Sequence, residues 1–385
     1  MALRHDPTPA PLRIMLMLTG LKVGGAEYQV AALAGAFRAL GHAVAIVSLS
    51  PGREVEVPAD VEVIELAMRK TPLGFARALC RARALVRAWR PDIIHAHMVH
   101  ANLFARVLTR IVRCPPLVCT AHSFREGGTA RMLAYRLTDH WCALTTHVSE
   151  AGRAGMIAAG AVPAARMVVM PNGIDIERFR HDVARRAATR ASFGLDDATP
   201  LLLHVGRLVP EKAQHLLIDA FARLDNARAQ LLMAGGGPLA EALANQIATL
   251  GLDDRVQLLG PRQDIPALLD AADAFALSSD IEGSPLVLAE ALASGCPVVS
   301  TDAPGAREII GNTAEGGMIV PRGDAEALAA AISATLRAGR GDAHAQAMRR
   351  DHVRATSALD TVAQRWLACY RALRASPRDA RLEAA

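Results

Sequence analysis

Short apolar runs alternate with longer amphipathic stretches along most of this chain of 385 residues. In the first half, apolar runs bounded by glycine, proline or serine predict strands, and helical patterns follow most of them. The expected strands of this half are 12–18, 43–49, 61–66, 91–95, 117–121 and 143–148. The expected helices are 26–40, 72–89, 129–141 and about 150–159. This alternation is typical of an α/β fold with a parallel sheet.

The same alternation restarts after Pro171-Asn172-Gly173-Ile174-Asp175, a run rich in turn-forming residues that marks the expected hinge. The strands expected beyond it are 201–205, 230–234, 256–259, 274–277, 297–301 and 318–320. A helical tail begins near residue 345, and Val362, Trp366 and Tyr370 share one face of it. We predict two doubly wound domains, 1–171 and 172–355, and a C-terminal helix, 356–385, that could return to the first domain.

Composition limits the classes of protein to consider. The 51% hydrophobic content fits large cores, whereas 4% aromatic residues argue against a stacking platform for nucleic acid. No run of about eighteen apolar residues predicts a membrane-spanning helix, and Met1 to Pro11 does not resemble a signal peptide. The six cysteines show no paired spacing, which fits reduced thiols. We therefore expect a cytoplasmic protein without a nucleic-acid partner.

The net charge of +5 is unevenly distributed. Residues 1–170 contain 20 Lys and Arg against 11 Asp and Glu, and the remainder contains 23 against 27. The predicted helix 72–89 is especially basic, and the cations on it and just before it are Arg69, Lys70, Arg77, Arg81, Arg83 and Arg87. This helix could rest on an anionic membrane surface or could simply be a solvated basic face.

The first half offers two candidate sites. Gly24-Gly25, between a strand and a helix, suits a phosphate or, alternatively, close packing of helix on strand. His122 follows strand 117–121 and could face a ligand or be structural. His95, His97 and His100 lie close together, but no cysteine or carboxylate completes a tetrahedral set, so we expect no metal.

Loops at the ends of the second set of strands carry further chemistry. Arg207 and Lys212 flank a loop into a helix, and two cations at a sheet edge fit a diphosphate. In the stretch 278–292, Ser284 is suited to an N-cap, with Pro285 in the first helical position and free N–H groups behind it.

Glu282 lies before that helix and Glu290 within it. Carboxylates that accept from hydroxyls, beside N–H groups that bind an anion, suit a phosphorylated sugar. An ordinary strand-to-helix turn with two solvated glutamates is the alternative.

With these motifs together, the chain resembles glycosyltransferase family 4, whose members are retaining, nucleotide-sugar-dependent enzymes of the GT-B fold. The resemblance runs from the first strand to the final helix. It rests on the combination of Gly-Arg-x4-Lys, Glu-x7-Glu and Gly-x-Pro-Val-Val. It implies two Rossmann-like domains that face a cleft, with the donor on the second, the acceptor mainly on the first, and the last helix crossing back. It implies no metal and no cofactor other than the nucleotide-sugar substrate.

The resemblance also implies roles for individual residues. Arg207 and Lys212 would neutralise the donor diphosphate, Glu282 would face the sugar hydroxyls, and Glu290 would face the ribose. The implied catalytic residues are Glu282, His122, Arg207 and Lys212. The other implied donor-binding residues are Gly24, Gly25, Arg262, Gln263, Gly283, Ser284, Pro285, Leu286 and Val287. Many members have Phe-Gly or Leu-Pro where this chain has Ser284-Pro285, which leaves the donor sugar open.

We therefore expect a retaining hexosyltransferase of surface polysaccharide biosynthesis, with UDP as the nucleotide and a glycan or lipid-linked saccharide as acceptor. It would work in the cytoplasm or peripherally on the inner face of the membrane. A sugar-nucleotide 2-epimerase of the same fold and a non-catalytic nucleotide-sugar-binding protein stay open as alternatives. A nicotinamide-dependent oxidoreductase is least expected, because strand 43–49 ends without an acidic residue for a ribose.

Overall fold

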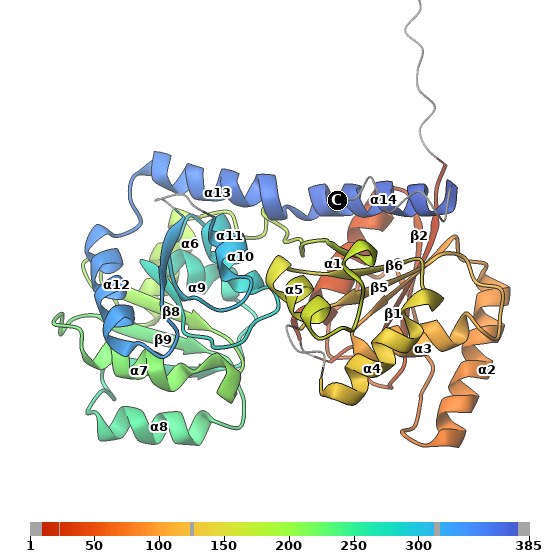
Figure 1. Ribbon diagram of the computed structural model, residues 1–385. Helices are drawn as coiled ribbons and strands as arrows, with labels where there is room; N and C mark the ends of the chain where they lie inside the picture. Colours follow the sequence, from red (N-terminus) through yellow and green to blue (C-terminus); the bar gives the residue numbers. More distant parts are fainter. Residues whose placement is uncertain (1–9, 23, 124–126, 312–315, 376–385) are drawn as a thin grey trace, which may run out of the picture. The chain divides into compact units, whose positions relative to one another are not determined.

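The computed structural model describes residues 10–375, except 23, 124–126 and 312–315. The chain forms two compact units, each built around its own parallel sheet (Figure 1). The first unit comprises Met1–Val148, Arg153–Met170 and Val362–Ala385, and the second comprises Ser149–Gly152 and Pro171–Thr361. Three expectations concern residues outside the described part: the polar segment 1–9, Val23 of the glycine loop, and the end of the tail, 376–385.

The sheet of the first unit has the strand order β3-β2-β1-β4-β5-β6-β7, and all of these pairs are parallel. β1 lies between β2 and β4, so the winding reverses at β1/β4, where open α/β sheets bind ligands. The strands are β1 (Arg13–Leu18), β2 (Ala43–Ser48), β3 (Glu62–Glu65), β4 (Ile93–His97), β5 (Leu117–Ala121), β6 (Leu144–His147) and β7 (Met167–Val169).

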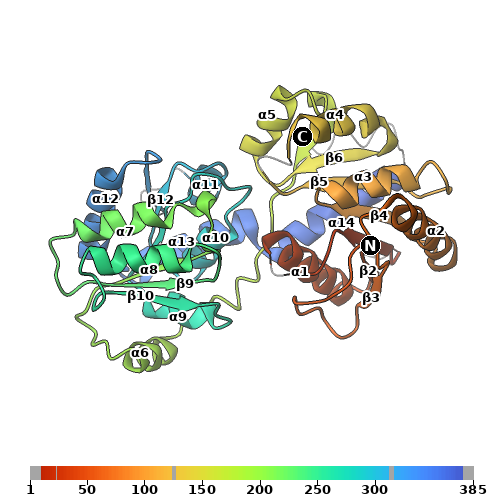
Figure 2. The ribbon, with the colours of Figure 1, turned by 90° about the horizontal axis from the view of Figure 1, so that it is seen from below.

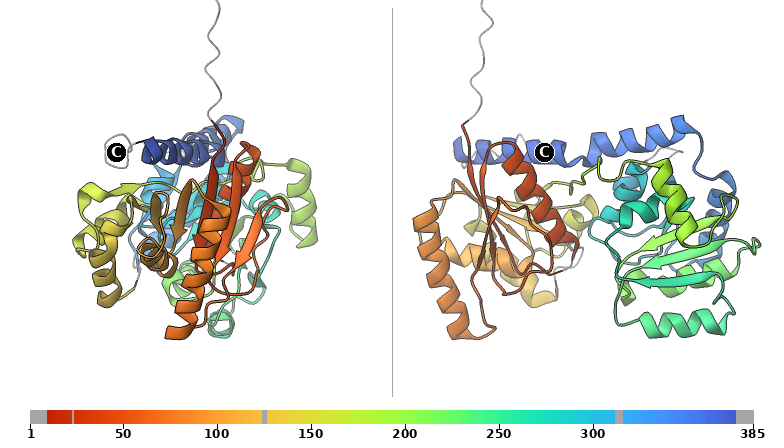
Figure 3. Two further views of the ribbon diagram at one scale, coloured as in Figure 1. Left: turned by 90° about the vertical axis from the view of Figure 1, so that its right-hand side faces the viewer. Right: turned by 180° about the vertical axis from the view of Figure 1, so that it is seen from behind.

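Helices cover both faces of this sheet, because successive strand residues point to opposite faces. Met15 and Met17 of β1 pack with α2 (Pro72–Trp89) and α3 (Val99–Leu108), and Figure 3 shows α2 in orange beside the strands. On the other face, Phe37 of α1 (Gly25–Ala39) contacts Tyr370 of α14 (Leu359–Ala375), with 5.8 Å between the ring centroids. The unit also contains α4 (Thr129–Thr138), η1 (Asp139–Trp141), most of α5 (Glu150–Ala158) and η2 (Ala164–Arg166).

The second unit repeats the doubly wound plan, with the strand order β10-β9-β8-β11-β12-β13 and parallel pairs throughout. Its winding reverses at β8/β11, the counterpart of β1/β4. The strands are β8 (Leu201–Val205), β9 (Gln230–Ala234), β10 (Val256–Gly260), β11 (Ala274–Leu277), β12 (Val298–Thr301) and β13 (Gly317–Val320).

Two hydrophobic cores flank this second sheet, and Figure 2 shows the helices of this unit around its strands. Leu202 and its neighbours on one face pack against α7 (Gln214–Ala222), α8 (Ala240–Thr249) and α12 (Ala325–Ala338). Leu201 and Leu203 on the other face belong to a second core, to which four helices contribute. These are α9 (Ile265–Ala271), α10 (Leu286–Ala293), α11 (Ala306–Ile310) and α13 (Ala343–Ser357). The remaining elements are α6 (Val183–Ser192), which packs on α9, and η3 (Pro210–Lys212).

The predicted fold class, two doubly wound α/β sheets, is confirmed. Most predicted elements differ from the observed ones only at their ends, and the two discussed next differ more. The strand expected at 91–95 is β4, Ile93–His97. Proline has no N–H for a ladder, and the Asp92 carboxylate instead accepts from the Arg13 N–H at 2.8 Å. The single helical tail is two helices, because the backbone around Ala358 pairs with Ile174. Among the described residues, no helix combines the length and apolar character that crossing a bilayer requires.

Candidate active site

Two loops meet at the switch point of the second sheet. One follows β8 and contains η3, and the other runs from Ser278 after β11. The Asp280 N–H donates to the carbonyl of Glu211 at 2.9 Å, and the Ser278 hydroxyl donates to the carbonyl of Lys212, also at 2.9 Å. The sequence therefore places both candidate motifs of this half, Gly-Arg-x4-Lys and Glu-x7-Glu, at the sheet edge where ligands bind.

Lys212 and Glu282 form the ion pair at the centre of this edge. The Lys212 Nζ lies 2.5 Å from Glu282 Oε1, and the Ser279 hydroxyl donates to the same oxygen at 2.6 Å. The side chain of Glu282 is 8% exposed and that of Lys212 is 20% exposed. Within the described residues Oε2 of Glu282 has no hydrogen-bond partner, so this oxygen can accept from a ligand hydroxyl.

Arg207 differs from Lys212 because it is exposed, and within the described part of the chain its guanidinium has no ion pair. Its backbone is held from below by Gln214, whose Nε2 donates to the Arg207 carbonyl at 2.7 Å. Gln214 also lies 3.3 Å from Nε2 of the buried His204, whose Nδ1 is 3.0 Å from the Ala276 carbonyl. Burial lowers the pKa of His204 to about 4, so the ring is neutral at neutral pH.

Sequence reasoning missed His204 and Gln214. The available signal was a histidine inside the apolar run Leu201–Val205, since a buried polar side chain requires a partner. A neutral His204 donates from Nδ1 to the Ala276 carbonyl and accepts from Gln214 at Nε2. These two side chains thus link β8, β11 and α7 beneath the Arg207 loop.

The start of α10 differs from the sequence expectation. Pro285, not Ser284, occupies the N-cap position, and no side chain caps the helix. The Leu286 N–H donates to the Ser284 carbonyl at 2.9 Å, so it is not directed at a ligand. Pro285 has no N–H to donate, and its ring fixes the φ angle at the start of the helix. Among the described residues, the Val287 N–H has no backbone acceptor, so it is available to an anion here.

Glu290 lies one turn into α10 and is half-buried. Burial raises the pKa of its carboxyl to about 7, and the positive charge of Arg178 opposes that shift. In the described part of the chain this carboxylate has no hydrogen-bond partner. A carboxylate in this state accepts strongly from a ligand hydroxyl, because the hydrogen bond replaces lost solvation.

Neighbouring loops complete the edge. At Gly235, where φ is +145°, a Cβ would lie 1.9 Å from the Gly206 carbonyl oxygen, so glycine is needed for this close approach. At Gly305 a Cβ would lie 2.9 Å from the Gly283 carbonyl oxygen. Arg262, expected to bind the donor, pairs with Asp264 at 2.6 Å after β10, the outermost strand. Gln263 beside it is exposed.

The first unit brings its own candidates to the carboxyl edge of its sheet. A Cβ at Gly25 would meet nothing within 4 Å, and one at Gly24 would meet the Glu27 carboxylate at 2.3 Å. Close helix–strand packing therefore does not explain these glycines. His122 is half-buried, with Nε2 3.0 Å from Nδ1 of His97. Burial, and then repulsion by His147, lowers the pKa of His122 to about 3, which suits hydrogen bonding better than proton transfer.

The close histidines of β4 do not form a metal site. His95 and His97 share one face of the strand, 3.9 Å between ring centroids, but three of their four ring nitrogens hydrogen-bond to tyrosine, threonine and His122. His100 lies on α3 and is exposed. Within the described ranges, no group of three or more histidine, cysteine or carboxylate residues could hold a metal ion.

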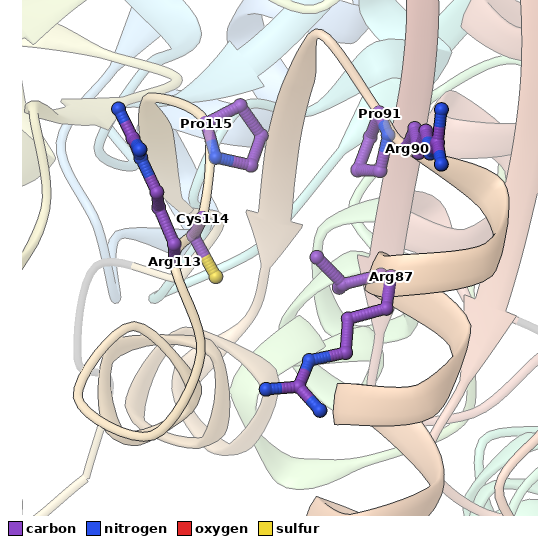
Figure 4. A pocket seen from close by; sticks show the side chains of 7 residues that line it. Arg87, Arg90, Pro91, Arg113, Cys114 and Pro115 are labelled. Atoms are coloured by element: carbon purple, nitrogen blue, oxygen red, sulfur yellow. The ribbon is translucent and has the colours of Figure 1, made fainter.

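The basic character of the first half is concentrated in one stretch. Residues 69–115 contain ten Lys and Arg and a single acidic residue, Asp92. Asp92 is already paired with Arg374 at 3.0 Å. Before β4 and β5, at the amino edge of the sheet, a cavity of about 460 Å³ is lined by arginines (Figure 4). Arg87 points into the space between α2 and the segment that follows α3. The lining residues are Val86, Arg87, Arg90, Pro91, Arg113, Cys114 and Pro115.

Comparison with known sequences places both units. Residues 23–178 match the profile described as Glycosyltransferase Family 4, and residues 185–350 match the one described as Glycosyl transferases group 1. The chain is 27% identical to the putative glycosyltransferase EpsF of Bacillus subtilis over 75% of this chain and 79% of that protein.

Two further relatives carry more specific names. One is the UDP-Gal:alpha-D-GlcNAc-diphosphoundecaprenol alpha-1,3-galactosyltransferase of Escherichia coli, 27% identical over 63% of this chain and 66% of that protein. The other is the GDP-mannose-dependent alpha-(1-6)-phosphatidylinositol monomannoside mannosyltransferase of Mycobacterium tuberculosis, 33% identical over 59% of this chain and 62% of that protein.

Among solved structures, Anabaena HepE in complex with UDP aligns with a TM-score of 0.82 at 24% identity, over 94% of this chain and 100% of that one. The sucrose-phosphate synthase of Thermosynechococcus elongatus aligns with a TM-score of 0.80 at 20% identity, over 94% of this chain and 100% of that one. These likenesses concern the fold.

Proposed function

Since this chain belongs to glycosyltransferase family 4 and is a glycosyltransferase of the GT-B fold, we propose that it moves a hexose from a nucleotide diphosphate sugar to a saccharide acceptor. The acceptor is a glycan or a lipid-linked saccharide, in polysaccharide or glycolipid biosynthesis. The proposal rests on the Lys212–Glu282 pair at the β8/β11 switch point, beside the exposed Arg207. The named relatives are transferases, so an epimerase or a non-catalytic binding protein is not favoured.

In this proposal the second unit binds the donor. Arg207 and Lys212 contact the diphosphate, and a planar guanidinium can bind two phosphate oxygens at once. The Val287 N–H adds a donor at the positive end of α10. Oε2 of Glu282 accepts from a sugar hydroxyl, while Glu290 accepts from the ribose. The fixed positive charges stabilise the leaving diphosphate as the glycosidic bond breaks.

We propose retention of anomeric configuration. Two relatives are named for α-linked products, from UDP-galactose and GDP-mannose. Both donors carry an α-glycosyl phosphate, so an α product preserves the configuration. In a front-face route the acceptor oxygen attacks on the side of the departing phosphate, which takes the acceptor proton. The neutral His122, with its pKa near 3, fits a route in which a phosphate oxygen accepts that proton.

UDP is the nucleotide that we propose first. The HepE structures named for complexes with UDP and UDP-glucose have the same fold, and one named relative uses UDP-galactose. The GDP-mannose-dependent relative makes GDP the alternative that must be tested beside it.

The test is nucleotide release from UDP- and GDP-sugars with saccharide acceptors, followed by assignment of the product's anomeric configuration. Arg207→Ala should raise the activation free energy of the reaction by about 2–4 kcal/mol, so that kcat/KM falls about 30- to 1,000-fold. Arg228→Ala is the matched control, because Arg228 is an exposed arginine of the same unit that precedes β9 at the opposite edge. If Arg207→Ala turns over like the parent, the diphosphate assignment is wrong.

We also propose that the basic stretch 69–115 contacts an anionic membrane surface. The arginines of the cavity, Arg87, Arg90 and Arg113, have no ion pairs among the described residues, and nearby Asp92 is engaged elsewhere. Each arginine near such a surface contributes about 1 kcal/mol. Changing all three to Gln should therefore weaken binding to phosphatidylserine-containing vesicles by about 3 kcal/mol at low salt.

The control for this membrane experiment removes the same charge from the second unit, at Arg223, Arg228 and Arg337. It should leave vesicle binding unchanged. Equal binding of both triple variants, or equal binding of the parent to uncharged phosphatidylcholine vesicles, would contradict this part of the proposal.

A further inference from the structure

A chain of buried side chains runs from α14 through β4 toward His122. His95 is fully buried, with Nδ1 2.6 Å from the Tyr370 hydroxyl and Nε2 2.6 Å from the Thr120 hydroxyl. Its ring lies 4.4 Å from the Trp366 ring and 3.9 Å from that of His97. His95 and His97 are two residues apart on one strand face, so fixing the first restricts the second.

All of these imidazoles are neutral at neutral pH. Burial, followed by neighbouring histidines, holds the pKa of both His95 and His97 well below the ordinary value. A neutral imidazole has one N–H and one acceptor nitrogen, so each hydrogen bond depends on which nitrogen carries the proton.

The hydrogen-bond partners of His97 select one tautomer for His97 and for His122. His97 is 1% exposed, and its Nε2 has no partner among the described residues. If Nε2 carried the proton, an N–H would be buried without an acceptor, whereas an unpaired acceptor nitrogen is the less costly defect. His97 therefore carries its proton on Nδ1 and donates to Nε2 of His122 across 3.0 Å. His122 must then carry its own proton on Nδ1.

The backbone at Met98, directly after His97, is strained. Met98 has φ +70° and ψ 154°, outside the regions that a non-glycine residue normally adopts. Its N–H donates to the Thr120 carbonyl at 3.1 Å, and Asn102 Nδ2 donates to the same carbonyl at 2.9 Å. Such strain persists where surrounding structure determines it and is concentrated at functional sites.

We propose that His97 is a positioning residue that fixes the orientation and tautomer of His122, and that α14 secures His97 through the buried ring of His95. The inference rests on the proposed function for the part that His122 plays in sugar transfer. The hydrogen bond itself does not depend on that function.

The experiment compares His97→Asn with His97→Leu in the full chain. The Asn amide nitrogen can take the place of Nδ1 and keep a donor toward His122, whereas Leu keeps bulk without a donor. Long-range nitrogen–proton NMR of the histidine rings reports which nitrogen of His122 is protonated, and nucleotide release reports kcat and the donor KM. His122→Ala, alone and combined with His97→Leu, completes the set.

We expect His122 to be protonated on Nδ1 in the parent and in His97→Asn, and to change or mix tautomers in His97→Leu. kcat should fall on the order of 10- to 100-fold in His97→Leu, the scale of losing a residue that orients a functional group, with the donor KM little changed. His97→Asn should recover most of the loss. In the His122→Ala background, His97→Leu should add little, because both act through one group.

An unchanged His122 tautomer in a folded His97→Leu would overturn the inference. If the tautomer changes but His122→Ala turns over like the parent, the positioning role stands and the proposed part of His122 in transfer fails.

Discussion

Burial of Glu290 should make the stability of the second unit fall as pH rises. The carboxyl pKa is about 7 in the folded chain, against an ordinary value of 4.5. The folded state therefore holds more protons than the unfolded state between these pH values, so unfolding free energy decreases across this window. A difference of about 2.5 units corresponds to about 3.4 kcal/mol, and partial exposure of the side chain reduces this to about 2–3 kcal/mol.

Glu290→Gln removes this titration. Relative to the parent, the variant should gain about 2–3 kcal/mol in unfolding free energy between pH 5 and pH 8. All three tryptophans and all three tyrosines lie in the first unit, at positions 28, 89, 135, 141, 366 and 370. Circular dichroism therefore follows the unfolding of both units in urea, whereas tryptophan fluorescence follows the first unit.

Glu241→Gln is the matched control, since Glu241 is an exposed glutamate in the first turn of α8. A Glu290→Gln difference that is the same at pH 5 and pH 8 would refute the reasoning from burial. If the carboxylate also binds the ribose, donor binding near pH 7 should release a proton from the parent and not from Glu290→Gln. Calorimetry in two buffers of different ionisation enthalpy measures this release.

Three further predictions concern the packing around the two sites. Lys212→Met should cost about 2–4 kcal/mol of unfolding free energy because it leaves Glu282 buried without its cation. Adding Glu282→Gln should restore much of that loss, and additive effects of the two substitutions in urea unfolding would contradict the pairing. Gly235→Ala should lower the free energy of unfolding by at least about 1–3 kcal/mol, because alanine is strained at this positive φ. The clash with Gly206 should also weaken donor binding, and an unchanged melting temperature would argue against this loop geometry. Tyr370→Phe should lower the free energy of unfolding by about 1–3 kcal/mol, because it leaves a nitrogen of His95 unpaired. Trp366 fluorescence should then report unfolding at a lower urea concentration, and full retention of stability would contradict that buried contact.

Local signals were sufficient for most of the fold. The helix predicted at 72–89 is α2 with the same bounds, because the Thr71 side chain accepts from the Gly74 N–H and Pro72 follows at the first position. Strands 201–205, 230–234 and 274–277 also agree residue for residue. Such apolar runs are short, bounded by turn residues and buried on both sides, so they carry their own boundaries.

The details of the site depended on contacts that sequence spacing does not contain. Glu282 and Lys212 are 70 residues apart, and their pairing requires β11 to lie next to β8. The bond between His95 and Tyr370 spans 275 residues. At α10, the turn from the Leu286 N–H to Ser284 removed a donor that cap preferences had assigned to an anion. Local propensity could place these residues on the right edge but could not assign their partners.

We expect a nucleotide diphosphate to bind at the β8/β11 edge of the second unit. Titration calorimetry of UDP and GDP against the parent, Arg207→Ala, Lys212→Ala and the Arg228→Ala control measures this binding. We predict that the parent and the control bind one of the two nucleotides alike. Arg207→Ala and Lys212→Ala should each bind it about 10- to 100-fold more weakly, since each loses a charge-assisted contact of about 1.5–3 kcal/mol. Equal affinity of all four proteins for the diphosphate would contradict the claim.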